Sequence, residues 1–190
     1  MSGRAADGAA AVAAYAPARG PLPAPVAIPK PLRAQIYAHA RAAFPAECCG
    51  YLTGPATGGG AAAVSVDDAV PCRNAQGDGG HPTEPHRGAD TGFVIAGAEL
   101  LAFARSFDGP RPARVVYHSH TNGRAYFSTV DQELARGPAY PVQHLVVGVT
   151  ARGPTEAALF GWSGADGAYV ELARWPAELA EPAEPAEAAP

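Results

Sequence analysis

The sequence lacks the features that mark several large classes of protein. It contains no block of Lys and Arg, and its 14 basic and 18 acidic residues give a net charge of −4. Such a charge does not attract nucleic acid or an anionic membrane. No apolar run approaches the roughly 18 to 20 residues that cross a bilayer. We therefore expect no nucleic-acid partner and no membrane partner, and the sequence leaves the oligomeric state open.

Cysteine is scarce as well, with three in the whole chain. Cys48 and Cys49 are adjacent, so a disulfide between them would be strained, and an odd number leaves one thiol over. The N-terminus offers only a short Ala/Val stretch, which is a weak core for a signal peptide. These observations predict a cytoplasmic protein whose cysteines, Cys72 included, are small buried apolar side chains.

The two ends of the chain have too few large apolar side chains to form a core. Residues 1–25 are mainly Ala, Gly and Pro, and residues 177–190 are rich in Pro, Ala and Glu. Such segments bury too little surface to offset the entropy lost on ordering. We expect a disordered N-terminal segment, an acidic extended tail, and one folded domain over 26–176.

Within that domain, hydrophobic periodicity predicts alternating helices and strands. The predicted helices cover 31–44, 96–107 and 129–136. The predicted strands cover 48–54, 61–70, 113–120, 142–150, 156–163 and 167–175, the first two forming a hairpin around the loop 55–60. The segment 71–91 lacks periodicity and is longer than an ordinary connection, which is typical of a functional or disordered insert. The pattern indicates an α+β or mixed α/β fold, with a central mixed sheet flanked by two to three helices.

The chemistry gathers in HSHTNGRAYFSTVD, residues 118–131. In a strand alternate side chains share a face, so His118 and His120 project together. Two imidazoles can bind one metal ion, and Asp131 from the next element would supply an oxygen ligand. Two His and one Asp leave a fourth position open, as in catalytic zinc sites. The alternative is that both histidines only bond backbone carbonyls at a strand end.

Ser128 stands three residues before Asp131, so both can share one face at the start of a helix. There the hydroxyl could donate to a developing oxyanion. Ser-x-x-Asp before an apolar run is also a capping motif, and Thr129 with Gln132 forms a second candidate cap. The spacing alone leaves the catalytic and the structural interpretation open.

An upstream Glu47, in PAECCGYLTG after the first helix, completes a pattern of Glu, His-x-His, seven residues and Ser-x-x-Asp. In order and spacing this resembles the signature of the JAMM (MPN+) metalloprotease family. ECCG after a helix and YHSH after a Val-rich strand resemble its bacterial branch, which includes peptidases acting on sulfur-carrier proteins. The resemblance covers roughly residues 28–165 and implies a cytidine-deaminase-like core. Taken alone, Glu47 would be read as a salt-bridge residue.

The resemblance implies roles for five residues. One Zn²⁺ per chain would be held by His118, His120 and Asp131. Glu47 would accept a proton from the attacking water, and Ser128 would stabilise the tetrahedral intermediate.

The implied substrate is an amide at the C-terminus of a ubiquitin-like or sulfur-carrier protein with a Gly-rich C-terminal tail. Two alternatives stay open: a non-catalytic MPN-type protein-binding scaffold, and a zinc amidohydrolase acting on a small substrate. Family members commonly have proline where this chain has Thr121 and Phe127, a departure that concerns the rigidity of the loop rather than the ligand set. Asn74 is a further candidate for contacting substrate, with a turn role as its alternative.

Overall fold

The computed structural model describes residues 22–56, 64–78 and 86–177. The N-terminal segment predicted to be disordered therefore lies outside these ranges except for its last four residues, and the predicted tail lies outside except for Ala177. No helix among the described residues is long and apolar enough to span a membrane.

The centre of the molecule is a six-stranded mixed sheet with the order β2-β1-β3-β4-β5-β6. Neighbouring strands are antiparallel except for β3 and β4, which are parallel. This confirms the predicted mixed sheet. The strands are β1 (Cys49–Thr53), β2 (Asp68–Cys72), β3 (Ala113–His120), β4 (Gln143–Thr150), β5 (Gly153–Ser163) and β6 (Ala168–Pro176).

Three α-helices accompany the sheet, at the places where periodicity predicts them. They are α1 (Lys30–Ala43), α2 (Gly97–Ser106) and α3 (Thr129–Arg136). Pro31 lies in the first turn of α1, where its missing N–H costs nothing. The helix ends before Phe44, whose backbone is extended because Pro45 follows it.

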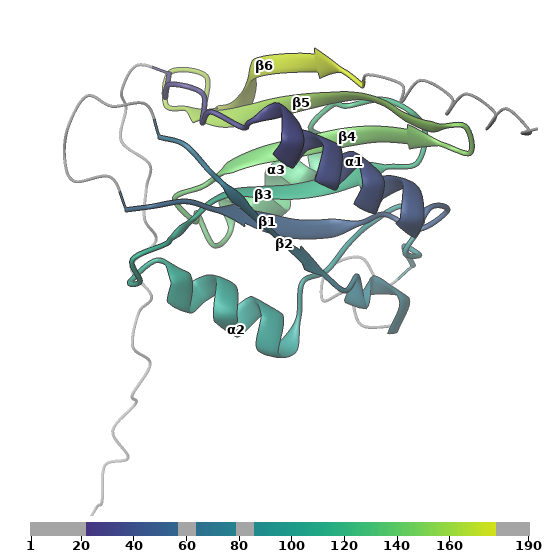
Figure 1. Cartoon of the computed structure of the whole chain (residues 1–190), viewed down its shortest axis with the longest axis horizontal. Coiled ribbons are helices and arrows are strands. Elements are labelled where there is room, and N and C mark those ends of the chain that lie inside the picture. The colour runs from purple at the N-terminus through teal and green to yellow at the C-terminus, as the bar shows by residue number, and fades with distance from the viewer. Residues whose placement is uncertain (1–21, 57–63, 79–85, 178–190) are drawn as a thin grey trace, which may run out of the picture.

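The helices cover both faces of the sheet (Figure 1). Ile36 of α1 packs in one core with Val115 and Tyr117 of β3. Phe103 of α2 packs in a second core with Val116, the residue between those two. Alternate residues of β3 therefore point to two faces of the sheet, one covered by α1 and the other by α2 and α3. His118 lies on the face covered by α2 and α3, because its ring stacks on Phe93 beside the second core.

The prediction for the second strand of the hairpin was wrong in both bounds. β2 pairs with β1 as expected, but it runs over Asp68–Cys72 instead of 61–70, and its first pair joins Thr53 to Asp68. Val66 is buried in the α1-face core before the pairing begins, and Ser65 forms an isolated bridge with Ala27. Val66 is thus buried in the core and does not pair with β1. The predicted loop lies partly outside the described residues.

The long insert predicted at 71–91 is structured wherever it is described. Its first residues complete β2, and Ala75–Asp78 form a short 3-10 helix, η1. Residues 86–91 return to the sheet, where the Glu47 N–H donates to the Ala89 carbonyl at 2.7 Å. The tip of the insert, 79–85, lies outside the described residues.

Candidate metal centre

The end of β3 and the start of α3 bring three ligand-type side chains together. His118 Nε2 lies 3.1 Å from His120 Nε2. The Asp131 carboxylate lies 3.6 Å from the first of these nitrogens and 3.4 Å from the second. Among the described residues these three form a group whose ligand atoms all lie within 4.8 Å of one another. The predicted ligands thus converge, and their role in binding a metal stays a prediction.

The donor set fits a small divalent cation. Tetrahedral zinc, with bonds of about 2.0–2.1 Å, places its ligand atoms about 3.3 Å apart, and the three separations of 3.1, 3.4 and 3.6 Å lie around that value. Two Nε2 atoms in contact can share only one proton, so at least one lone pair points at the other ring. Both Nδ1 atoms are buried and lack a hydrogen-bond partner among the described residues.

Electrostatics also favours a cation at this point. Burial lowers the pKa of His118, but the charge and hydrogen bond of Asp131, together with the charge of Glu47, outweigh burial, so the net shift is upward. Burial raises the pKa of Asp131, and His118, together with hydrogen bonds, shifts it far below its ordinary range. The carboxylate therefore stays ionised beside the imidazoles, and a cation would neutralise it.

Glu47 lies two residues before β1, next to this cluster. It is buried, and with His120 and Asp131 it lines a cavity of about 10 Å³, which is room for about one water-sized ligand. Burial raises its pKa to about 7; His118 opposes this rise and Asp131 adds to it. Carboxyl groups tuned near neutrality can accept and return protons. The geometry therefore places a candidate base beside the candidate ligands.

Ser128 is the N-cap of α3. Its Oγ accepts a hydrogen bond from the Asp131 N–H at 3.1 Å, and its own N–H donates to Asp131 Oδ2 at 2.8 Å, which completes a capping box. Ser128 and Asp131 therefore have the structural role that their spacing allowed, as a helix cap. The Ser128 hydroxyl proton remains available as a donor, and the cap fixes the orientation of the Asp131 carboxylate.

The loop between β3 and α3 is anchored to the sheet. The Ala125 N–H donates to Glu156 Oε1 at 2.8 Å, and Arg174 donates to the Ala125 carbonyl at 2.9 Å. Thr155 Oγ1 donates to the Gly123 carbonyl at 2.6 Å. Residues from β5 and β6 therefore hold the middle of the loop that joins the histidines to Asp131.

The two positions that depart from the family pattern hold the ends of the same loop. Thr121 Oγ1 donates to the Asp90 carbonyl at 2.9 Å. Phe127 packs against His144, Phe160 and Tyr169, with ring centroids 4.9 to 5.4 Å apart. These contacts supply rigidity that proline would supply through its fixed φ.

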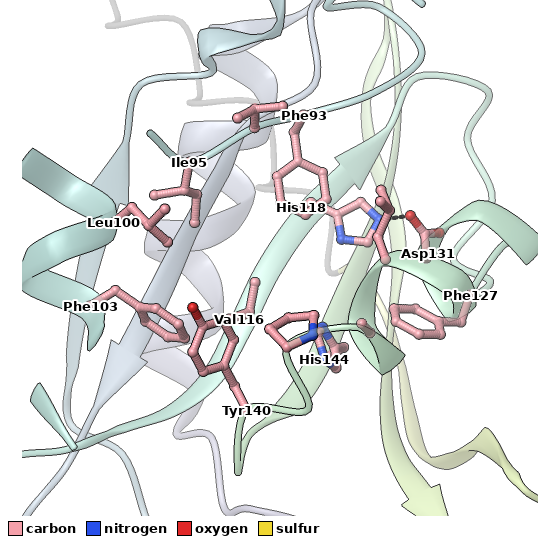
Figure 2. A pocket seen from close by; sticks show the side chains of 14 residues that line it. Phe93, Ile95, Leu100, Phe103, Val116, His118, Phe127, Asp131, Tyr140 and His144 are labelled. Atoms are coloured by element: carbon pink, nitrogen blue, oxygen red, sulfur yellow. Dashed lines mark ion pairs between the residues drawn. The ribbon is translucent and has the colours of Figure 1, made fainter. Parts of the chain in front are cut away.

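Sequence reasoning missed a second, larger cavity beside the cluster (Figure 2). It has a volume of about 340 Å³, and His118 and Asp131 form part of its wall. The rest of the wall is mainly apolar and aromatic, and Phe93 stacks on the His118 ring at 4.6 Å. These side chains come from four separate segments of the chain, which no local motif links.

Other conspicuous residues have structural partners. All three cysteines are buried thiols, as predicted, and burial raises the pKa of Cys48 to about 11. His39 Nδ1 bonds the Tyr117 hydroxyl at 2.9 Å. Asn74 donates to the carbonyls of Glu47 and Gly92 at 3.0 and 2.9 Å, so its amide holds the segment that carries the candidate base.

Comparison with known proteins identifies the family of the chain. The family model of prokaryotic homologs of the JAB domain matches residues 29–161. The chain belongs to this family. The resemblance to JAMM/MPN proteins is thereby confirmed at the level of the JAB domain, and the match includes all five candidate site residues. No protein with a curated description matches the sequence significantly.

Solved structures resemble this JAB-domain chain in fold. A solution structure from Desulfitobacterium hafniense is 22% identical, covers 77% of this chain and 89% of its own, and has a TM-score of 0.52. A solution structure from Salinibacter ruber is 22% identical, covers 76% of this chain and 86% of its own, and has the same TM-score of 0.52. A JAB1/MPN domain protein from Archaeoglobus fulgidus is more distant, at 16% identity, 76% and 94% coverage and a TM-score of 0.39.

Proposed function

We propose that this JAB-domain protein is a zinc-dependent metallopeptidase or isopeptidase of the cytoplasm. It would hydrolyse an amide at the C-terminus of a ubiquitin-like or sulfur-carrier protein with a Gly-rich tail. The observation that carries the proposal is the convergence of His118, His120 and Asp131 at separations of 3.1 to 3.6 Å, with Glu47 lining the adjoining cavity.

His118, His120 and Asp131 would hold the metal. When bound, zinc acts as a Lewis acid that polarises a carbonyl and acidifies water. Glu47, in a cavity with room for about one water, would take the proton of the attacking water and return it to the leaving amine. Ser128 would donate its hydroxyl proton to the oxyanion while its Oγ continues to cap α3.

The decisive variant is Glu47→Gln, which keeps the size of the side chain and removes its basicity. We expect turnover to fall below detection while the metal content is unchanged. Glu133→Gln makes the same substitution on α3 at an exposed position and should retain full activity. Unchanged hydrolysis by Glu47→Gln would remove this residue from the mechanism.

Two alternatives have separate tests. A protein-binding scaffold would show no hydrolysis before or after chelation, whereas the proposed peptidase contains stoichiometric metal and loses activity on chelation. A panel of carrier-protein adducts and short amides separates the peptidase from an amidohydrolase of small substrates. Imidazole and carboxylate also bind iron, cobalt or nickel, so elemental analysis identifies the metal.

A further inference from the structure

The two cavities beside the candidate metal centre differ in size and in chemistry. The small one has a volume of about 10 Å³, and Glu47, Gln76 and Arg87 are in its wall. The large one has a volume of about 340 Å³ and a wall that is almost entirely hydrocarbon and aromatic. Asp131, Phe93 and Leu134 line both, so the two cavities adjoin at the cluster. The cluster therefore has a water-sized polar cavity on one side and a wide apolar cavity on the other.

The large cavity is built to hold an apolar group. A cavity of about 150 Å³ lined by Leu, Ile and Phe is large enough to bind benzene, so about 340 Å³ can take an aromatic side chain and its backbone. Leu100 and Phe103 come from α2, and Val116 comes from β3. Figure 2 shows Leu100 and Phe103 on the side of the cavity away from Asp131, with Val116 between, so an occupant would extend from the cluster toward α2.

An occupant of this cavity must carry a large apolar side chain and lie beside the candidate metal ligands. The insert segment 79–85, which begins next to η1, reads GGHPTEP and contains no large apolar side chain. Since His118 and Asp131 are in the cavity wall, a group bound there lies beside the residues that would hold the metal. A substrate residue adjoining the reacting amide satisfies both conditions.

We infer that the 340 Å³ cavity is a specificity pocket for a large apolar side chain on the residue directly after the scissile amide. This inference rests on the proposed function and specifies its substrate: the small cavity holds the attacking water, the carrier ends in glycine at the scissile amide, and the released residue is aromatic or a large aliphatic. Water adds across the Gly–X amide, so the C–N bond breaks, glycine gains a carboxylate and X leaves with a free amine.

Binding tests the pocket without relying on turnover. The probes are acetyl-Gly-Gly-Phe-amide and acetyl-Gly-Gly-Gly-amide, titrated into the metal-free full chain and followed by NMR amide shifts. Burying a large apolar side chain favours the Phe peptide by roughly 10- to 100-fold in Kd. Shifts should centre on α2, β3 and α3. Equal affinity of the two peptides would overturn the inference.

Two adjacent leucines of α2 provide a matched pair of variants. Leu100 lines the cavity and is 39% exposed, whereas Leu101 is 49% exposed and does not line it. Leu100→Asp should weaken binding of the Phe peptide about tenfold, because it places a carboxylate in the apolar wall. Leu101→Asp should leave binding unchanged. The same loss in both variants, or in neither, would contradict the pocket.

Hydrolysis separates this inference from the proposed function. The metal-loaded protein is offered a carrier ending in Gly-Gly-Phe, one ending in Gly-Gly-Gly and one ending in Phe-Gly-Gly. Preference for release of Phe supports the inference. Cleavage without that preference, or with preference for Phe before the amide, overturns it while the peptidase function stands. No cleavage, with selective binding of the Phe peptide, removes the peptidase function and leaves an apolar peptide site.

Discussion

The two faces of β3 treat buried polar groups in opposite ways. On the α1 face, the Tyr117 hydroxyl bonds His39 Nδ1 at 2.9 Å, and Ser119 Oγ accepts the Cys48 N–H at 2.8 Å. On the other face, His118 and His120 turn Nε2 toward one another, and their buried Nδ1 atoms have no partner among the described residues. On the α1 face the buried polar groups form hydrogen bonds within the protein. On the other face the two Nε2 atoms face one another, where they could bind a metal ion.

This difference follows from what each face must do. Buried polar groups in folded proteins are nearly always hydrogen-bonded, and exceptions concentrate where function requires them. The α1 face closes over Ile36, Leu52 and Val115, all fully buried. The opposite face leaves two cavities and places a carboxyl group with a pKa of about 7 beside them. The α1 face of β3 is packed as a core, whereas the opposite face carries the candidate site and its cavities.

The largest expected effect separates the histidines of the two faces. His118→Asn removes a candidate ligand and should lower metal affinity by more than about 100-fold, since loss of a residue that only hydrogen-bonds to a ligand already costs about 10- to 100-fold. His39→Asn, the control, should leave metal affinity unchanged and cost about 1 kcal/mol of unfolding free energy through the lost Tyr117 bond. Calorimetric titration with Zn²⁺ and denaturant unfolding measure both. Loss of metal binding in His39→Asn would contradict the prediction that only the face with His118 and His120 binds metal.

The second effect concerns the stability cost of Glu47. Its folded-state pKa is raised from 4.5 to about 7, so below pH 4.5 the buried carboxyl is neutral and costs nothing. Between pH 4.5 and 7 the unfolded chain releases this proton while the folded carboxyl keeps it, so the metal-free fold loses up to about 3 kcal/mol over that range. Metal-free Glu47→Gln should therefore be more stable than the wild type above pH 7 and equal to it near pH 4. Denaturant unfolding at several pH values measures the difference, and a constant difference across pH would rule out this cause.

A third pair of variants separates the two roles of Ser128. Ala at an N-cap costs about 1 kcal/mol, whereas Gly costs only a few tenths. Both remove the hydroxyl, which as an oxyanion donor is worth about 100- to 1,000-fold in kcat. We expect Ser128→Ala and Ser128→Gly to lose activity equally and to differ in thermal stability. If activity instead follows stability, the capping box seen in the structure is the whole role of Ser128.

The sequence predicted the candidate site better than it predicted the surrounding cavities. That His118 and His120 share a face follows from strand alternation, a local property, whereas the approach of Asp131 and Glu47 was expected from the resemblance to the family signature. β2 was predicted seven residues too early at its start, because alternation in Val64–Val66 says nothing of whether those residues pair or pack. The 340 Å³ cavity could not be predicted, since Phe93, Leu100, Val116 and Tyr140 meet only through tertiary packing.

The smallest expected effect tests the anchor of the loop between β3 and α3. Glu156 and Glu171 both pair with Arg174, but only Glu156 also accepts the N–H of the buried Ala125. Glu156→Ala leaves that N–H without its acceptor and should cost about 1 kcal/mol, with faster hydrogen exchange at the Ala125 amide. Glu171→Ala removes an exposed ion pair and should cost less than about 0.5 kcal/mol, with exchange unchanged. Equal exchange in the two variants would mean that Phe127 and Thr121 hold the loop without help from Glu156 of β5. The candidate ligands would then depend only on contacts made at the two ends of the loop.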